Sequence, residues 1–191
     1  FLVYYTNMKN QSEHTMDAKV FTIRHPLEED VDILTHYMDE LSREKTYIVP
    51  QGERTTKKET LEYIKKVRKN IRDKKEVCLL MFCEKELIGM ANVSLRQKIY
   101  KHIGNSSITI KKSFRGKGLG MLLIEMLLSE TLHLSGIKKI VLQVFGNNIP
   151  AINLYKKIGF RKYGHLPRAI KWRGKYIDEI LMYKDMDNHY R

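Results

Sequence analysis

The sequence predicts a fold of the α/β (α+β) class, in which helices flank a mixed, mostly antiparallel central sheet. Short segments whose apolar residues alternate with polar ones indicate strands, and longer segments with apolar residues every three or four positions indicate helices. In chain order they predict a strand, two helices, three strands, a helix, a strand, a helix and two strands. A length of 191 residues with 42% hydrophobic and 30% charged residues fits one globular domain.

The first half of the chain carries five of these elements. Pro50 and Gly52 separate the first helix from a second, strongly basic one, and a tight turn joins the two strands that follow. We expect these elements at Lys19–Arg24, Glu28–Arg43, Thr56–Lys74, Glu76–Glu84 and Glu86–Leu95. The basic face of the second helix lacks interleaved aromatic residues, so a solvated surface is favoured over a nucleic-acid-binding one.

The second half continues with a half-buried strand and a long apolar helix. Gly136 is typical of a helix end, and Pro150 is tolerated in a first helical turn. We expect a strand at Ser106–Ile110, a helix at Leu119–Leu134, a strand at Lys139–Phe145, a short helix from Pro150 to Lys157, and two strands that turn at Arg173–Lys175.

The loop Arg115-Gly116-Lys117-Gly118-Leu119-Gly120 joins that strand to the long helix and predicts an anion site. Glycines leave backbone N–H groups uncovered, and the free N–H groups and dipole of a helix N-terminus attract negative charge. The spacing fits neither a P-loop nor a dinucleotide-binding fingerprint. A phosphate-bearing ligand is therefore expected, against the alternative of a glycine-rich turn beside a solvated basic patch.

Charge and cysteine content limit the partners and the compartment. With 35 Lys and Arg against 22 Asp and Glu, the net charge of +13 favours a polyanion, a membrane surface or a phosphorylated cofactor as partner. Cys78 and Cys83 fall on opposite faces of one strand, so two free thiols in a reducing, cytoplasmic setting are expected. Scattered histidines predict no metal site, and Leu119–Leu134 is too short for the about 20 residues of a membrane span.

A second motif lies some thirty residues downstream, where Asn148-Ile149-Pro150-Ala151-Ile152-Asn153-Leu154-Tyr155 is followed by Lys157-Ile158-Gly159-Phe160. Together with Arg115–Gly120, in this order, it resembles the GCN5-related N-acetyltransferase (GNAT) superfamily. The resemblance implies a three-layer sandwich and acetyl-CoA as co-substrate, with no metal. It also implies direct attack of a primary amine on the thioester in a ternary complex.

The resemblance assigns roles to individual residues. Arg115 and the amides of Gly116, Lys117, Gly118, Leu119, Gly120 and Met121 would bind the pyrophosphate of acetyl-CoA. Ile108 and Ile110 would offer backbone groups to the pantetheine and the thioester, and Asn148 would contact the pantetheine side. Tyr155 would be the general acid for the departing thiolate. Each has a structural alternative: the isoleucines also fill core, Tyr155 is a packing aromatic and Asn148 is a helix N-cap.

One departure from the family pattern concerns the base. Gln143 stands where some relatives that act on protein N-termini carry a Glu, and Gln cannot take a proton. The candidates that remain are Glu40, Glu44, Glu53, Asp178 and Glu179. The acceptor is expected to meet the loops 46–55 and 168–176, whose Tyr47, Trp172, Arg173 and Tyr176 suit a flat or anionic group.

The sequence therefore predicts an N-acetyltransferase whose domain spans residues 17–191, with residues 1–16 set apart as a tag or other non-native extension. The amine acceptor is expected to be an amino acid, an amino-acid-like antibiotic or a protein N-terminus. A non-catalytic basic module that binds nucleic acid or acyl-CoA is the alternative, and it leaves the ordered pair of motifs unexplained. Nucleic acid is not favoured as partner, and homodimerisation is left open.

Overall fold

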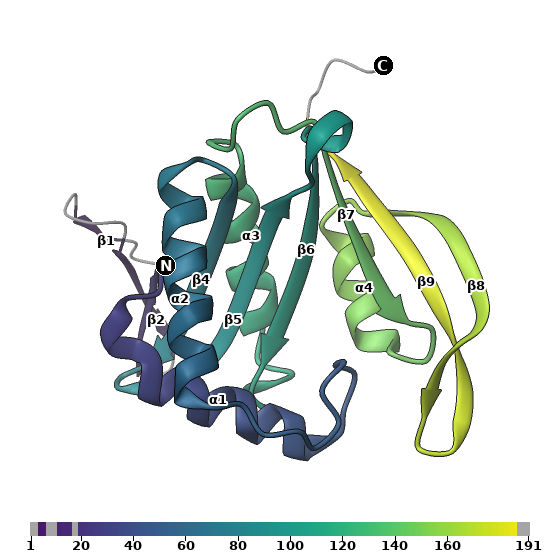
Figure 1. The fold of residues 1–191 in the computed structure, drawn as a ribbon, viewed down its shortest axis with the longest axis horizontal. Coiled ribbons are helices and arrows are strands. Elements are labelled where there is room, and N and C mark those ends of the chain that lie inside the picture. The colour runs from purple at the N-terminus through teal and green to yellow at the C-terminus, as the bar shows by residue number, and fades with distance from the viewer. Residues whose placement is uncertain (1–3, 7–10, 17–18, 187–191) are drawn as a thin grey trace.

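A computed structural model describes residues 4–6, 11–16 and 19–186, which form one sheet with helices on both faces (Figure 1). The nine strands pair in the order β1-β2-β3-β4-β5-β6-β7-β9-β8, and only β6 and β7 are parallel. The strands are β1 Tyr4–Thr6, β2 Gln11–Met16, β3 Lys19–Arg24, β4 Glu76–Cys83, β5 Glu86–Leu95, β6 Ile103–Ile110, β7 Lys139–Phe145, β8 Arg161–Trp172 and β9 Lys175–Asp185. The predicted fold class, a mixed and mostly antiparallel sheet flanked by helices, is confirmed.

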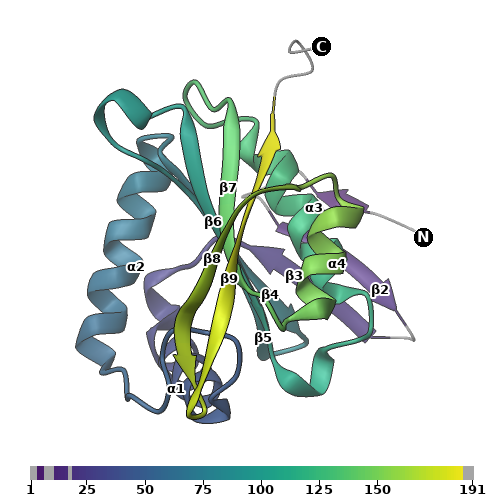
Figure 2. The same cartoon turned by 90° about the vertical axis from the view of Figure 1, so that its right-hand side faces the viewer.

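Helices α1 and α2 cover one face of the sheet, and α3 and α4 cover the other (Figure 2). Their bounds are α1 Val31–Glu44, α2 Lys57–Arg72, α3 Leu119–Thr131 and α4 Ile149–Lys157, with short 3-10 turns at Glu28–Asp30, Lys98–Tyr100 and Lys112–Phe114. The alternation of side chains along each central strand sends one set to each helix layer. The sheet therefore separates two hydrophobic cores, one under each pair of helices.

The larger core explains why α3 is so apolar. Leu119, Leu123, Ile124 and Leu127 are buried on one side of the helix, against β4, β5 and β6. Because this core fixes α3 along most of its length, it also fixes the position of the helix N-terminus.

The sheet opens between β6 and β7. These strands pair only at Ile103–Asn105 with Lys139–Val141, and from there they diverge (Figure 1). The edge of β6 that faces β7 therefore has no strand partner from Ser106 to Ile110. Unpaired backbone groups at such an edge can bind an extended ligand, as in strand addition.

The observed elements match the expected ones from β3 onwards, with shifts of a few residues at some ends. The predicted long helix ends at Thr131 rather than Leu134, because residues 132–135 form turns. The sheet also extends into the segment set apart as 1–16, since β2 pairs with β3 and β1 with β2. Among the residues that the structure describes, no helix is long and apolar enough to cross a membrane and no cluster of metal-ligating side chains is found.

Candidate active site

A cleft of about 870 Å³ passes through the sheet where β6 and β7 diverge. On one face it is bounded by α3 and α4, and on the other by the end of α1 and the loop that follows. Helices α3 and α4 contribute Met121, Leu122, Glu125, Pro150, Ala151, Leu154 and Lys157 to its lining, and the α1 side contributes Leu41, Thr46, Tyr47 and Ile48. Strand β6, the glycine loop and the N-cap of α4 contribute Ile108, Thr109, Ile110, Arg115, Gly116, Gly118, Gly120 and Asn148. The cleft thus brings both sequence motifs and the first acceptor loop together.

The glycine loop lines one end of this cleft. Gly116 and Gly118 have φ of 75° and 81°, and a Cβ at either position would meet no atom within 4 Å. Gly118 is the N-cap of α3 and supplies no side chain to cap the first turn of the helix. Uncapped N–H groups at a helix N-terminus, with open space in front of them, form a cradle that fits a pyrophosphate.

Arg115 ties the glycine loop to the opposite helix layer. Its Nε donates a hydrogen bond to the carbonyl oxygen of Ile110 at 2.7 Å, and its Nη2 lies 2.6 Å from Oε2 of Glu44 on α1. Glu44 is mostly buried, so water and salt screen this ion pair less than an exposed one. Arg115 therefore lines the cleft and also fixes the distance between the loop and α1.

The two isoleucines of β6 serve both the core and the cleft. Ile108 and Ile110 are partly buried, pack against the larger core and line the cleft. Between them Thr109 faces the α1 layer, where its hydroxyl lies 2.9 Å from the hydroxyl of Tyr37. Burial raises the pKa of Tyr37 well above its usual range, so it stays neutral. This neutral hydrogen bond holds α1 against the strand that borders the cleft.

Helix α4 supplies the second motif. Asn148 is its N-cap, with Oδ1 accepting a hydrogen bond from the backbone N–H of Ala151 at 3.3 Å, and Asn148 also lines the cleft. Tyr155 is 6% exposed and its ring packs 5.7 Å from that of Phe160. Burial raises the pKa of Tyr155 to about 12, and among the described residues its hydroxyl has no hydrogen-bond partner. Tyr155 is not among the residues that line the cleft, so its contact with the departing thiolate stays a prediction.

Three aromatic residues from separate segments pack together on the α1 face, where Tyr47 lines the cleft. Tyr47 stacks on Trp172 at 5.1 Å between ring centroids, and Phe145 of β7 meets both rings edge-on. The indole Nε1 of Trp172 donates to the carbonyl oxygen of Lys45 at 3.1 Å. The tip of the β8–β9 hairpin is therefore docked on the α1–α2 loop.

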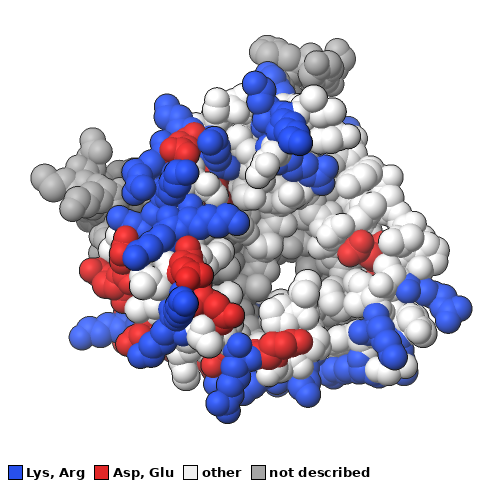
Figure 3. Space-filling view, in the orientation of Figure 1, with Lys and Arg blue, Asp and Glu red and all other residues white. Residues whose placement is uncertain are grey.

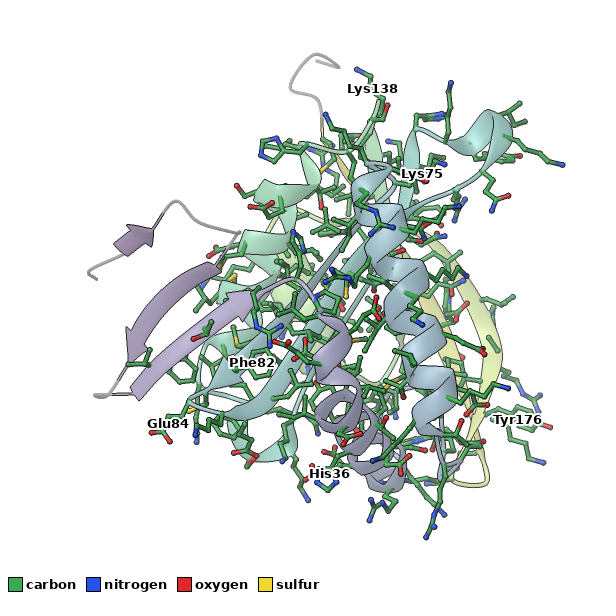
Figure 4. All side chains as sticks on the ribbon, turned by 60° about the vertical axis from the view of Figure 1, so that its left-hand side comes forward. His36, Lys75, Phe82, Glu84, Lys138 and Tyr176 are labelled. Atoms are coloured by element: carbon green, nitrogen blue, oxygen red, sulfur yellow. The ribbon has the colours of Figure 1, made fainter. Side chains whose placement is uncertain are left out.

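The acceptor residues expected from the sequence do not act alike. The guanidinium of Arg173 lies 4.6 Å above the ring of Trp172 and also donates to Lys45, so its charge faces the protein. Tyr176 points outward from the hairpin tip (Figure 4), and the guanidinium of Arg168 lies over its ring. Of the four side chains named for a flat or anionic group, only Tyr47 lines the cleft directly.

The five candidate bases differ in whether their carboxylates already hold a partner within the protein. Four of them already hold a partner: Glu40 pairs with Lys111, Glu44 with Arg115, Glu53 accepts the N–H of Gln51, and Asp178 accepts from the N–H of Arg168 and pairs with His165. The bond from Arg168, reinforced by His165, lowers the pKa of Asp178, which suits an anchor for the bulge in β8 rather than a base. Glu179 has no such partner among the described residues.

Sequence reasoning missed several cleft residues on the helices. Glu125 lies one turn after Met121 on α3, while Leu154 and Lys157 continue the face of α4 that begins at Ala151. Their helical spacing from motif residues is a signal that could have identified them. Lys157 adds a positive charge to the cleft wall, which suits a phosphate-bearing ligand.

The comparisons with known proteins agree with this geometry. The family model described as "Acetyltransferase (GNAT) family" matches residues 34–160. A relative described as a probable spermine N(1)-acetyltransferase of Bacillus subtilis subsp. natto is 31% identical over 115 residues, which are 56% of this chain and 76% of that protein.

Solved structures extend the likeness over most of the chain. A GNAT acetyltransferase from Streptococcus pneumoniae superposes with a TM-score of 0.81 at 26% identity, over 87% of this chain and 99% of that one. Spermidine N-acetyltransferase from Vibrio cholerae, solved in complex with CoA and spermine, superposes with a TM-score of 0.71 at 25% identity, over 87% and 95%. This chain therefore belongs to the GNAT acetyltransferase family and is an acetyl-CoA-dependent N-acetyltransferase.

Proposed function

We propose that this enzyme transfers the acetyl group of acetyl-CoA to a primary amine by direct attack in a ternary complex. The observation that carries the proposal is the cleft that crosses the sheet between β6 and β7. Its anion-binding end lies at the N-terminus of α3, and its other end reaches Tyr47 on the opposite face. Such a passage lets the donor enter from one face while the acceptor approaches from the other, so both can be bound at once.

On the donor side, the chain holds acetyl-CoA mainly with its backbone. The pyrophosphate is assigned to the backbone amides of the glycine loop, of which Gly116, Gly118 and Gly120 line the cleft, and Arg115 and Lys157 add positive charge. The edge of β6 that faces β7 offers the backbone of Ile108 and the N–H of Ile110 to the pantetheine arm, since the Ile110 carbonyl oxygen already accepts from Arg115, and Asn148 borders the arm from the α4 side. When bound, acetyl-CoA supplies an activated thioester carbonyl for an amine to attack.

Tyr155 stabilises the leaving thiolate with a hydrogen bond. Its pKa of about 12 lies above that of a thiol near ~8.5, so complete proton transfer to sulfur is uphill by about 5 kcal/mol. The buried hydroxyl therefore acts by donating a hydrogen bond to developing charge in a site with little water. The thiolate receives its proton from the attacking nitrogen or from water.

The acceptor must attack as a neutral amine. A lysine-like amine of pKa ~10.4 is neutral in only about one molecule in 2,500 at pH 7, and an α-amine near ~8 in roughly one in ten. The polyamines named for the relatives, amino acids, amino-acid-like antibiotics and protein N-termini all belong to this class. The net charge of +13 disfavours polycationic members, because long-range repulsion lowers their concentration near the surface.

The test is an acetyl-transfer assay with a panel of primary amines, followed by thiol release and by mass spectrometry of the products. We expect an increase of 42 Da in at least one amine, dependent on both enzyme and acetyl-CoA. Stabilisation of the protein by acetyl-CoA without transfer to any amine would instead identify an acyl-CoA-binding module.

A further inference from the structure

We propose that Glu179 binds the ammonium group of the acceptor and that this acceptor is a monoamine with an apolar body. The inference rests on the proposed acetyl transfer and specifies its second substrate. It follows from the position of Glu179 on β9, from the side chains around it and from its lack of a partner within the protein.

The register of the sheet places Glu179 on the α1 face, the one that the acceptor approaches. Glu179 is directly opposite Phe145 of β7 and Leu166 of β8, and residues opposite each other across antiparallel strands project to the same face. Phe145 contacts Tyr47, which lines the cleft. Phe145 and Tyr47 therefore link the position of Glu179 to the lining of the cleft.

The surface around Glu179 is apolar. Its neighbours across the sheet are Phe145 and Leu166, and its same-face neighbours along β9 are Ile177 and Leu181. The molecular surface between α2 and the β8–β9 hairpin is hollowed and mostly uncharged (Figure 3). A carboxylate among such neighbours is less hydrated than one on an open polar surface, so its attraction for a cation is stronger.

No described side chain satisfies this carboxylate. Glu179 takes part in no hydrogen bond or ion pair within the described residues, whereas Asp178, the next residue, faces the other helix layer and is held by His165 and Arg168. Gln143, where some relatives have Glu, is exposed and lies diagonally from Glu179 on the same face, because it pairs with Leu181. Glu179 can thus supply, from a neighbouring position on the same face, the negative charge that the neutral side chain of Gln143 lacks.

One carboxylate in an apolar surface selects a particular kind of amine. A single ammonium pairs with Glu179, and an apolar body covers the leucine, isoleucine and phenylalanine side chains around it. A polyamine would place its remaining charges against apolar side chains in a protein of net charge +13. An amino acid with an anionic side chain would meet repulsion from Glu179. Arg173 offers no compensation, because its guanidinium is stacked on Trp172.

The experiment compares three acceptors: phenethylamine as the apolar monoamine, spermidine as the polycation and glutamate as the anionic amine. For the wild type we expect kcat/KM for phenethylamine to exceed the other two by about tenfold or more. In Glu179→Gln the KM for phenethylamine should rise about tenfold, while kcat and the KM for acetyl-CoA stay within about twofold. Removal of a neighbouring anion favours the neutral amine, so kcat should not fall.

Two further variants test whether the effect comes from the carboxylate of Glu179 itself. Glu62→Gln removes a charge from the exposed side of α2 and should leave all constants unchanged. Glu179→Gln combined with Gln143→Glu moves the carboxylate diagonally across the same face and should recover most of the lost phenethylamine affinity. A wild type that prefers spermidine or glutamate would refute the inference.

Two outcomes for Glu179→Gln would also refute it. One is unchanged amine kinetics, and the other is a fall in kcat at constant KM, which would indicate a base rather than an ammonium site. Both leave the proposed function intact, since acetyl transfer would still occur. Transfer to no amine at all, by a protein that still binds acetyl-CoA, would refute the proposed function and with it this inference.

Discussion

The donor end and the acceptor end of the cleft are built in different ways. Most of the proposed donor end is one continuous segment, in which a strand edge, a glycine loop and a helix N-terminus present backbone groups, and α4 adds side chains beside it. The acceptor end consists of side chains from the α1–α2 loop, from β7 and from the β8–β9 hairpin, brought together by the stack of Tyr47, Phe145 and Trp172.

This difference predicts that substitutions change the acceptor end more readily than the donor end. Backbone amides of a glycine loop tolerate few substitutions, because a Cβ changes both the allowed φ and the space for the ligand. Side chains on separate loops can change one at a time without disturbing the sheet. Two of the relatives compared above are described as acting on spermine or spermidine, and this chain places the carboxylate of Glu179, unpaired within the described residues, on the face that we assign to the acceptor.

The largest expected effect concerns the hydroxyl proposed to stabilise the leaving thiolate. Tyr155→Phe removes the hydroxyl that we assign to the thiolate and should lower kcat by about 10²-fold, with little change in the KM for acetyl-CoA. Tyr163→Phe is the control, because it removes the hydroxyl of an exposed tyrosine on β8 and should leave kcat unchanged. An unaltered kcat in Tyr155→Phe would return Tyr155 to a purely packing role against Phe160.

The second prediction breaks the donor end alone. Gly118→Glu places bulk and negative charge at the N-terminus of α3 and should weaken acetyl-CoA binding by about tenfold or more, as measured by calorimetry. Gly136→Glu is the matched control, because Gly136 also has a positive φ of 69° and open space around it but lies outside the cleft lining. If both variants bind acetyl-CoA equally well, the pyrophosphate lies elsewhere.

The same contrast describes what could be predicted from the sequence. The elements from Lys19 onwards follow from hydrophobic periodicity and from glycine and proline positions, which are local signals. The donor loop is equally local, because Arg115–Gly120 is contiguous. The strands β1 and β2 lie within residues 1–16, which we set apart from the domain, so they are not among the expected elements.

The acceptor end depends on the register of strands far apart in sequence. Asp178 and Glu179 are adjacent and chemically alike, and only the pairing of Phe145 with Glu179 shows which of them faces the acceptor. Arg173 and Trp172 were grouped as ligand-binding side chains, yet they stack on each other. A one-residue change in register reverses every such assignment, and the sequence alone does not fix it.

The third prediction breaks the acceptor end alone. Trp172→Ala removes the stack on Tyr47 and the hydrogen bond to Lys45 that dock the hairpin tip, and should raise the KM for the amine about threefold to tenfold. Binding of acetyl-CoA should not change. Tyr176→Ala is the control from the same hairpin, because Tyr176 points away from the protein (Figure 4). Equal effects of the two variants would show that the stack does not shape the acceptor end.

The smallest expected effect is in the pH profile of kcat. The acceptor amine and Tyr155 should affect different parts of this profile, because they lose their protons at different pH. The acceptor amine must lose a proton, so kcat should rise with pH until the bound amine is mostly neutral. Tyr155 must keep its proton to donate a hydrogen bond, and its pKa of about 12 lies above the usual tyrosine value. Since a raised pKa extends the protonated form to higher pH, no descending limb should appear below about pH 10. A fall in kcat near pH 9 that is absent in Tyr155→Phe would mean that this hydroxyl is far less buried during catalysis, and that the cleft opens to water when the acceptor binds.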